Sequence, residues 1–141
     1  MFTLDVSVVV RSLDTADPNQ PVCQALIDAL EQRVVPIIVP RFLLTELAGA
    51  LRRIAGDPIR ARLIVSVWHA LPHVQIVSLD DGLIDAAAEL AGDYALRGSD
   101  AIYVAVAQCH TCTLVSLDRE QRERSAPVVV TATPSEALAR L

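Results

Sequence analysis

The chain alternates between short apolar segments and longer segments in which apolar residues recur every three or four positions. Most short segments are rich in valine and isoleucine, which favour extended backbone, so they are expected to be strands. The longer segments have the period of an amphipathic helix with one apolar face. The expected strands cover residues 2–4, 34–39, 74–79, 113–117 and 128–130, and an apolar run continues at residues 8–10, after Ser7. The expected helices cover residues 22–33, 41–55, 59–71, 81–96, a stretch that starts at Ser99, and residues 135–141.

Turn and capping residues separate neighbouring helices. Gly56 ends one helix, Asp57 caps the next, and Pro58 takes its first helical position. Gly98 and Ser99 separate another pair, and Ser99 is expected to be the N-cap of the second helix. These signals support the division of the chain into separate helices.

The alternation of strands and helices indicates the fold class. Strands separated by helices are typical of βαβ units, whose strands lie parallel in a sheet that helices cover on both faces. The chain has 141 residues, enough for one domain with a sizeable core, and residues 1–141 are expected to form it. In such sheets, functional residues gather beyond the carboxyl ends of the strands.

Composition and charge narrow the function classes. Although 52% of the residues are hydrophobic, no apolar run approaches the roughly 20 residues of a membrane span, and no signal-peptide pattern is present. A cytoplasmic protein is therefore expected. The net charge of −5 argues against a general nucleic-acid binder with a basic surface. All 12 basic residues are arginine, so any phosphate contact from a basic side chain must come from arginine.

The three cysteines do not indicate a disulfide framework. Cys109 and Cys112 match C-x-x-C, but they lie where a helix ends and a strand begins, not at a helix N-terminus that would activate a thiol. No second pair of cysteines or histidines completes a zinc site, and the histidines lack ligand spacing. A structural role is the favoured interpretation.

Four acidic residues fall at one edge of the expected sheet. Asp5 and Asp118 directly follow the first and fourth expected strands. Glu46 lies in the first turns of the helix after the second strand, and Asp100 lies in the first turn of the helix before the fourth. Singly, each acid has an ordinary structural explanation as a turn former or helix residue. Their common position at the carboxyl edge favours a shared function.

Converging carboxylates limit what this edge can do. Within a few ångströms they repel one another strongly, so either some bind protons or a cation is bound among them. A ligand set of oxygens, without histidine or cysteine, suits a hard ion such as Mg²⁺ or Mn²⁺. The four acids therefore predict a divalent-metal site.

The segments around these acids resemble the four acidic motifs of PIN-domain ribonucleases. Their order and spacing are most similar to those of the VapC toxins of bacterial toxin–antitoxin pairs. The matching segments are Leu4-Asp5-Val6-Ser7, Thr45-Glu46-Leu47, Ser99-Asp100-Ala101-Ile102 and Val115-Ser116-Leu117-Asp118. The resemblance covers essentially the whole chain, and its motifs are specific as a set. It implies a three-layer α/β/α sandwich with a five-stranded parallel sheet.

The resemblance also implies an activity and partners. The activity is Mg²⁺- or Mn²⁺-dependent endonucleolytic cleavage of RNA, in which metal-activated water attacks in line and leaves 5′-phosphate and 3′-hydroxyl ends. The partners are the RNA substrate and a cognate VapB-like antitoxin that inhibits cleavage, and assembly as a homodimer is usual. The RNA target and the number of metal ions, one or two, stay open.

Individual residues match the positions of the family motifs. The matches to the catalytic, metal-binding acids are Asp5, Glu46, Asp100 and Asp118. Ser7 and Ser116 match hydroxyl positions that orient the first and last of these acids. Glu120 is assigned instead to a solvated helical turn.

Two arginines near the acids are candidates for binding the RNA phosphate backbone. Arg97 precedes Asp100 by three positions, and Arg119 directly follows Asp118. The other interpretation, in which both are surface arginines paired with nearby carboxylates, is left open.

Two functions of other classes compete with a ribonuclease. A phosphorelay receiver domain also gathers acids at the carboxyl edge of a parallel sheet, but it needs a lysine near its end, and this chain has none. A catalytically silent PIN-like module that only binds RNA or protein remains the alternative. A metal titration with and without RNA separates this module from an enzyme.

The helices between residues 41 and 71 contain more apolar residues than one core face needs. Phe42, Leu44, Ile59 and Trp68 are among them. Part of this surface is expected to be covered by a second subunit or by an antitoxin segment, since large exposed apolar patches are uncommon on monomers. Trp68 is expected to make an apolar contact, either internally or with a partner.

Overall fold

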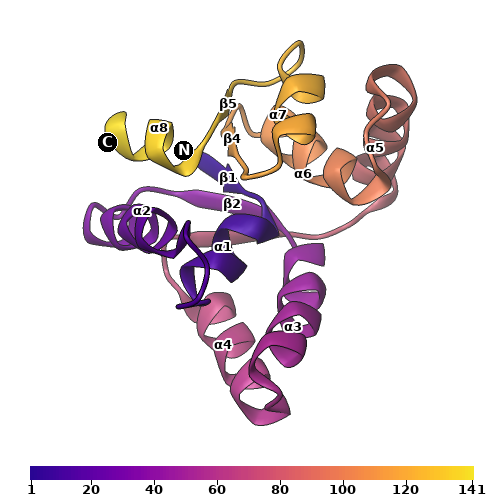
Figure 1. Cartoon of the computed structure of the whole chain (residues 1–141). Helices are drawn as coiled ribbons and strands as arrows, with labels where there is room; N and C mark the ends of the chain where they lie inside the picture. Colours follow the sequence, from indigo (N-terminus) through magenta and orange to yellow (C-terminus); the bar gives the residue numbers. More distant parts are fainter.

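Five parallel strands form one sheet, and the first strand of the chain lies at its centre. The computed structural model describes every residue from Met1 to Leu141. The strand order is β3-β2-β1-β4-β5 (Figure 1). The strands are β1 (Phe2–Leu4), β2 (Ile37–Pro40), β3 (Val74–Val77), β4 (Thr113–Val115) and β5 (Thr131–Ala132). The expected five-stranded parallel sheet is confirmed.

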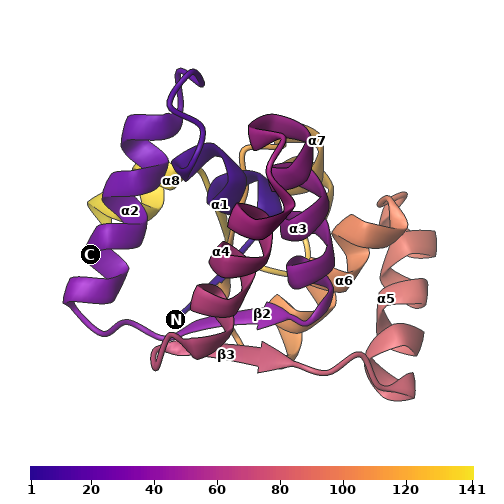
Figure 2. The same cartoon turned by 90° about the horizontal axis from the view of Figure 1, so that it is seen from below.

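Helices cover both faces of this sheet. They are α1 (Val6–Ser12), α2 (Gln20–Gln32), α3 (Phe42–Ala55), α4 (Pro58–Ala70), α5 (Asp81–Tyr94), α6 (Gly98–Cys109), α7 (Arg119–Ser125) and α8 (Pro134–Ala139). Figure 1 shows α1 to α4 on one side of the sheet and α5, α6 and α7 on the other. In Figure 2 the arrowheads of β2 and β3 point toward the side of the molecule where α5 and α6 lie. The arrangement is an α/β/α sandwich. None of its helices combines the length and apolar character that crossing a bilayer would need.

The central strands are enclosed by helices on both faces. Every residue of β1 and β2 is buried, whereas β3 at the sheet edge is partly exposed. Helix α6 packs across β1, β2 and β4, and Ala101 and residues 103–107 of this helix are buried. Helix α1 packs against both α2 and α3, so Val8, Val9 and Val10 are all buried. The apolar run after Ser7 is therefore a helix enclosed on several sides, which needs no regular polar stripe.

The fifth strand lies further along the chain than expected. The sequence predicts a strand at residues 128–130, but β5 covers Thr131–Ala132. The N–H groups of Val128 and Val129 both donate to the carbonyl of Ser125, so these residues complete the turn that follows α7. Only the carbonyl of Val130 reaches the sheet, where it accepts from the N–H of Leu114 at 2.8 Å. The strand prediction is wrong because local turn hydrogen bonds override the β-propensity of the valines.

Helix α6 also starts earlier than expected. The N-cap residue is Arg97, whose side chain makes no capping hydrogen bond, so the prediction of Ser99 as N-cap is wrong. The Arg97 carbonyl accepts from the N–H of Ala101 at 2.9 Å, which closes the first turn two residues before the expected start. Asp100 lies in the first turn, as predicted.

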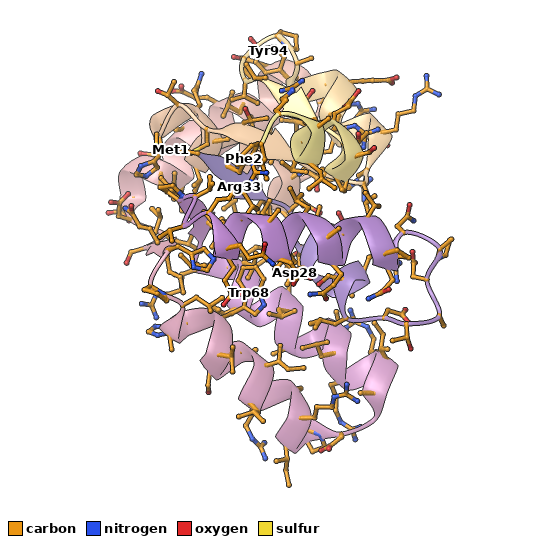
Figure 3. The ribbon with its side chains drawn as sticks, turned by 90° about the vertical axis from the view of Figure 1, so that its left-hand side faces the viewer. Met1, Phe2, Asp28, Arg33, Trp68 and Tyr94 are labelled. Carbon is orange, nitrogen blue, oxygen red and sulfur yellow. The ribbon has the colours of Figure 1, made fainter.

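Trp68 lies inside the protein. Its exposed fraction is 6%, and it belongs to the main core cluster. Figure 3 shows the Trp68 side chain on the side of α4 that is directed at α2. The predicted apolar contact is confirmed as an internal one. Ile59, at the start of the same helix, is 69% exposed.

The buried indole gives a direct test of this packing. Trp68 is the only tryptophan in the chain, so it dominates the fluorescence at long excitation wavelength. We expect blue-shifted emission and weak quenching by iodide in the folded protein, because the ring is surrounded by apolar side chains. Urea should shift the emission to the red in the same transition that abolishes the circular dichroism signal. Emission typical of a solvent-exposed indole in buffer would contradict the packing of α4 against α2.

Candidate active site

The two central strands deliver one acid each to the same edge of the sheet. β1 and β4 are parallel neighbours in which Leu4 pairs with Val115. Asp5 follows Leu4 directly, and its N–H donates to the Val115 carbonyl at 2.9 Å. Asp118 lies three residues beyond Val115 at the start of α7. The carboxyl ends of these strands thus bring both acids to one region, as the sequence predicts.

Asp5 is held rigidly by hydrogen bonds to both of its oxygens. Its side chain is the N-cap of α1, where Oδ2 accepts from the N–H of Ser7 at 2.8 Å. Oδ1 accepts from Nε2 of Gln121 at 3.3 Å. The residue is only 6% exposed. Two neutral donors therefore stabilise the buried Asp5 carboxylate. Each oxygen accepts one hydrogen bond and keeps a free lone pair for a further contact.

Glu46 lies in the second turn of α3 and is half-buried. The hydroxyl of Tyr103 on α6 donates to Oε2 of Glu46 at 2.6 Å. Burial raises the pKa of Glu46, the Tyr103 hydrogen bond lowers it, and the charges of Asp5 and Asp100 raise it further. The result is a carboxyl group with a pKa above its ordinary value, in a position that two other site acids influence electrostatically.

Asp100 is the most strongly perturbed acid of the site. Burial raises its pKa to about 6, with Arg97 opposing the rise and the charges of Asp5, Asp118 and Glu120 adding to it. Its side chain is 14% exposed. Because Asp100 is influenced by acids from two other elements, the four predicted residues form one electrostatic group.

Asp118 combines a structural and an electrostatic role. Its Oδ1 caps α7 by accepting from the N–H groups of Glu120 at 2.9 Å and Gln121 at 3.2 Å. Its Oδ2 accepts from the Arg97 guanidinium at 2.7 Å. One oxygen therefore caps helix α7, while the other binds the Arg97 guanidinium.

Arg97 lies among the site acids, whereas Arg119 lies beside them. The Arg97 guanidinium is 3.5 Å from Asp100, 2.7 Å from Asp118 and 3.8 Å from Glu120. The Arg119 side chain is 82% exposed and pairs with Glu123 at 2.6 Å. In this structure both arginines are paired with carboxylates, which is one of the two interpretations that the sequence leaves open.

The two serines support the backbone around the acids. The hydroxyl of Ser7 accepts from the N–H of Leu117 at 3.3 Å and so links the start of α1 to the segment after β4. The hydroxyl of Ser116 accepts from the N–H of Asp118 at 3.0 Å. It is the main-chain N–H of Ser7, not its hydroxyl, that binds Asp5. Both hydroxyls therefore fix the loop that presents Asp118.

Two residues that the sequence analysis does not single out also contact the acids. Tyr103 binds Glu46, and Gln121 binds Asp5. Gln121 is 1% exposed, and its Oε1 has no hydrogen-bond partner. The sequence contains a signal for both residues. Tyr103 follows Asp100, and Gln121 follows Asp118, by three positions, a spacing that places each pair on one face of a helix.

An open cavity of about 340 Å³ lies beside Glu46. It is lined by residues of α3 and the start of α1, namely Val6, Phe42, Thr45, Glu46, Gly49, Ala50 and Arg53. Arg53 adds a basic group close to one of the site acids. The cavity therefore opens beside the acidic edge on the α3 side.

The acids suit a hard cation by their chemistry. All four supply oxygens, two have raised pKa values, and the buried Oε1 of Gln121 lacks a donor. A divalent ion would stabilise the ionised form of each carboxylate. In the present arrangement, no three of the acids approach one point closely enough to hold an ion together. The donor set fits a hard ion by its chemistry, while the side chains are not gathered around one point in this structure.

Comparison with solved structures shows the same fold in other proteins. VapC20 from Mycobacterium tuberculosis, described as a sarcin–ricin loop cleaving toxin, has a TM-score of 0.76 and 17% identity over 92% of this chain and 97% of that one. A chain of VapBC2 from Rickettsia felis, solved with a promoter DNA fragment, has a TM-score of 0.71 and 12% identity over 94% and 97%. PAE2754 from Pyrobaculum aerophilum has a TM-score of 0.69 and 19% identity over 99% and 93%. At these identities the likeness is one of fold.

By sequence, a family model matches most of the chain, whereas comparison with curated proteins finds no match. The family model described as the PIN domain matches residues 2–126, which run from β1 through the end of α7 and include all four site acids. The chain belongs to the PIN domain family.

Proposed function

We propose that the protein is a Mg²⁺- or Mn²⁺-dependent endoribonuclease and the toxin of a toxin–antitoxin pair. The observation that supports the proposal most directly is the electrostatic coupling of Asp5, Glu46, Asp100 and Asp118 within a PIN domain. The solved structures with the same fold include a toxin described as cleaving the sarcin–ricin loop and toxin–antitoxin complexes. RNA is therefore the proposed substrate.

The four acids would hold the metal, and their neighbours would position them. When bound, a divalent ion would lower the pKa of a water molecule and stabilise charge on the reacting phosphate. Gln121 and the N–H of Ser7 fix the orientation of Asp5, and Tyr103 fixes Glu46. The acids would act as ligands first, and one of them would also accept the proton of the attacking water.

Arginines around the acidic edge would bind the RNA backbone. Arg119 is exposed and directly follows Asp118, and Arg97 is 62% exposed, so both guanidinium groups can reach solvent. Arg53, beside Glu46, extends the basic groups along the open cavity. Guanidinium groups bind phosphate in a bidentate manner, which suits them to this role better than a point charge would.

An apolar stripe on α4 would be covered by a partner, either a second subunit or a VapB-like antitoxin. Ile59, Leu63 and Val67 recur every four residues and are 69%, 63% and 51% exposed. Next to this stripe, residues of α3 and α4 contribute to a cavity of about 210 Å³ that Ile54 and Ile64 help to line, together with polar residues such as Asp14 and Arg60. A helix with one apolar face fits such a surface.

Metal dependence is the primary test of the proposed activity. Purified protein should cleave RNA with Mg²⁺ or Mn²⁺ and lose this activity in EDTA. Asp100→Ala should reduce the rate roughly a thousandfold, because it removes a metal ligand that stabilises the transition state. Asp85→Asn is a matched control, since Asp85 is an exposed acid on α5. Undiminished cleavage in EDTA would contradict a metal mechanism, and binding of RNA without any cleavage would favour a silent binding module.

Stability measurements test the same site without an activity assay. Between about pH 4 and pH 6 the folded protein binds more protons at Asp100 than the unfolded chain does, so the metal-free protein loses stability as the pH rises through this window. Asp100→Asn removes this penalty, and loss of the Arg97 contact offsets part of the gain. The variant should therefore be more stable than wild type by about 1–2 kcal/mol in EDTA at pH 7.

Two further conditions define the expected result for Asp100→Asn. Its advantage should shrink as the pH falls from about 6 and vanish below about pH 4, where Asp100 binds a proton in the unfolded chain as well as in the folded protein. Millimolar Mg²⁺ should raise the Tm of wild type more than that of the variant, because the variant binds the ion more weakly. A variant that melts below wild type in EDTA, or that gains as much from Mg²⁺, would show that Asp100 is only a helix residue.

The exposed stripe on α4 predicts an effect on assembly. Leu63→Asp places a charge in the middle of the stripe. It should weaken self-association, or binding of a candidate VapB-like antitoxin, here the protein encoded immediately upstream, as measured by sedimentation velocity. Val130→Asp is the control, because Val130 is similarly exposed, at 60%, next to β5. If both variants sedimented like wild type, alone and with the upstream protein, α4 would not be the partner surface.

A further inference from the structure

We propose that Arg97 is the internal counter-ion of the metal-free site and that a divalent ion must displace its guanidinium to bind. This inference rests on the proposed metal-dependent function and names a residue that controls metal affinity. Arg97 is the only basic side chain with contacts to two of the four site acids.

The oxygens of Asp100 and Asp118 that Arg97 contacts have no other hydrogen-bond partner. Oδ1 of Asp118 is committed to the α7 cap, whereas Oδ2 accepts only from Arg97. Asp100 has no hydrogen-bond donor among its neighbours, and its Oδ2 is 3.5 Å from Nε of Arg97. An ion held by Asp100 and Asp118 would draw on the same two carboxylates. The guanidinium and the ion therefore compete for one set of ligands.

The backbone of Arg97 is fixed, but its side chain is free to leave. The Arg97 carbonyl accepts the N–H of Ala101 and thereby belongs to the first turn of α6. The side chain makes no capping contact and is 62% exposed. Exposed ion pairs are weak and sensitive to salt, so the contacts to Asp100 and Asp118 can exchange for water without disturbing the helix.

Displacement would also change what Arg97 can bind. While paired with Asp100, Asp118 and Glu120, the guanidinium has little capacity for an incoming phosphate. Once a cation neutralises these acids, the same planar fork becomes available at the edge of the site. Arg97 would then act as a positioning residue for RNA only after the metal has bound.

The affinity for Mn²⁺, measured by electron paramagnetic resonance, tests this competition. Arg97→Gln should bind Mn²⁺ about threefold to tenfold more tightly than wild type, since the internal competitor is removed. Arg119→Gln removes an equal charge next to Asp118, but its side chain pairs with Glu123 only, so its affinity should stay near that of wild type.

A lysine variant separates displacement from simple repulsion at a distance. Arg97→Lys keeps the positive charge but cannot bridge Asp100 and Asp118 with a planar fork. If the ion displaces the guanidinium, the Mn²⁺ affinity of Arg97→Lys should lie between those of wild type and Arg97→Gln. If charge alone were responsible, Arg97→Lys would match wild type and Arg119→Gln would bind more tightly than wild type, and the proposal would be wrong.

The guanidinium itself can be observed by NMR. In wild type in EDTA, the Nε–H signal of Arg97, assigned by its loss in Arg97→Lys, should be shifted from the position of solvent-exposed arginines, because the guanidinium lies between Asp100 and Asp118. Titration with Mg²⁺ should move it to the position of solvent-exposed arginines, while the Arg119 signal stays unchanged. An Arg97 signal that Mg²⁺ leaves unaltered would overturn the displacement proposal even if the protein binds metal and cleaves RNA. Absence of Mn²⁺ binding in wild type and Arg97→Gln alike would overturn the metal site and this inference together.

Discussion

Repulsion among the carboxylates at the carboxyl edge of the sheet is the constraint that the surrounding structure must offset. Asp5 and Asp118 end strands and begin helices, so helix N–H groups stabilise their charges. Glu46 and Asp100 lie within helices and accept no such N–H groups. The Tyr103 hydroxyl donates to Glu46 instead, and the Arg97 guanidinium pairs with Asp100. Burial raises the pKa of Glu46 and of Asp100, and the charges of neighbouring acids raise both further, against the opposing effects of Tyr103 and Arg97. The acids thus divide into a rigid pair that caps helices, Asp5 and Asp118, and a pair whose charged form is disfavoured by burial, Glu46 and Asp100, which a cation would stabilise.

This division decides which substitutions report on chemistry alone. Replacing Asp5 or Asp118 removes a helix N-cap, which typically costs about 1 kcal/mol of stability in addition to any loss of metal binding. Glu46 and Asp100 cap nothing, so their amide variants alter charge with little effect on helix formation. The capping hydrogen bonds that begin α1 and α7 also fix the orientation of the Asp5 and Asp118 side chains. Folding and site assembly are therefore coupled at the sheet edge, and α3 and α6 complete the site by packing.

The sequence predicts the parallel sheet, nearly all the longer helices and the edge where the acids meet, because hydrophobic period and strand-end chemistry are local properties. It misplaces the strand at residues 128–130 and the cap at Ser99, where hydrogen bonds to residues outside the pattern decide the outcome. It also misses Tyr103 and Gln121 as partners of the acids. Their helical spacing was visible, but which acid each one meets depends on how α6 and α7 pack. The pairing of Arg97 likewise requires three-dimensional distances.

Four arginines near the acidic edge have internal partners, which affects how a protein of net charge −5 could bind RNA. Carboxylates or main-chain carbonyls pair with Arg97, Arg119, Arg122 and Arg124. A polyanion must exchange these contacts for its own, so the arginines bind it less strongly than their number suggests. A cation at the acids would release Arg97 and lower this cost. Binding free energies are reciprocal: if the metal favours RNA by releasing Arg97, RNA that holds Arg97 must strengthen metal binding by the same factor. Metal and RNA would then bind cooperatively, because the metal takes the place of the Arg97 guanidinium at Asp100 and Asp118 and the RNA phosphate binds the released guanidinium.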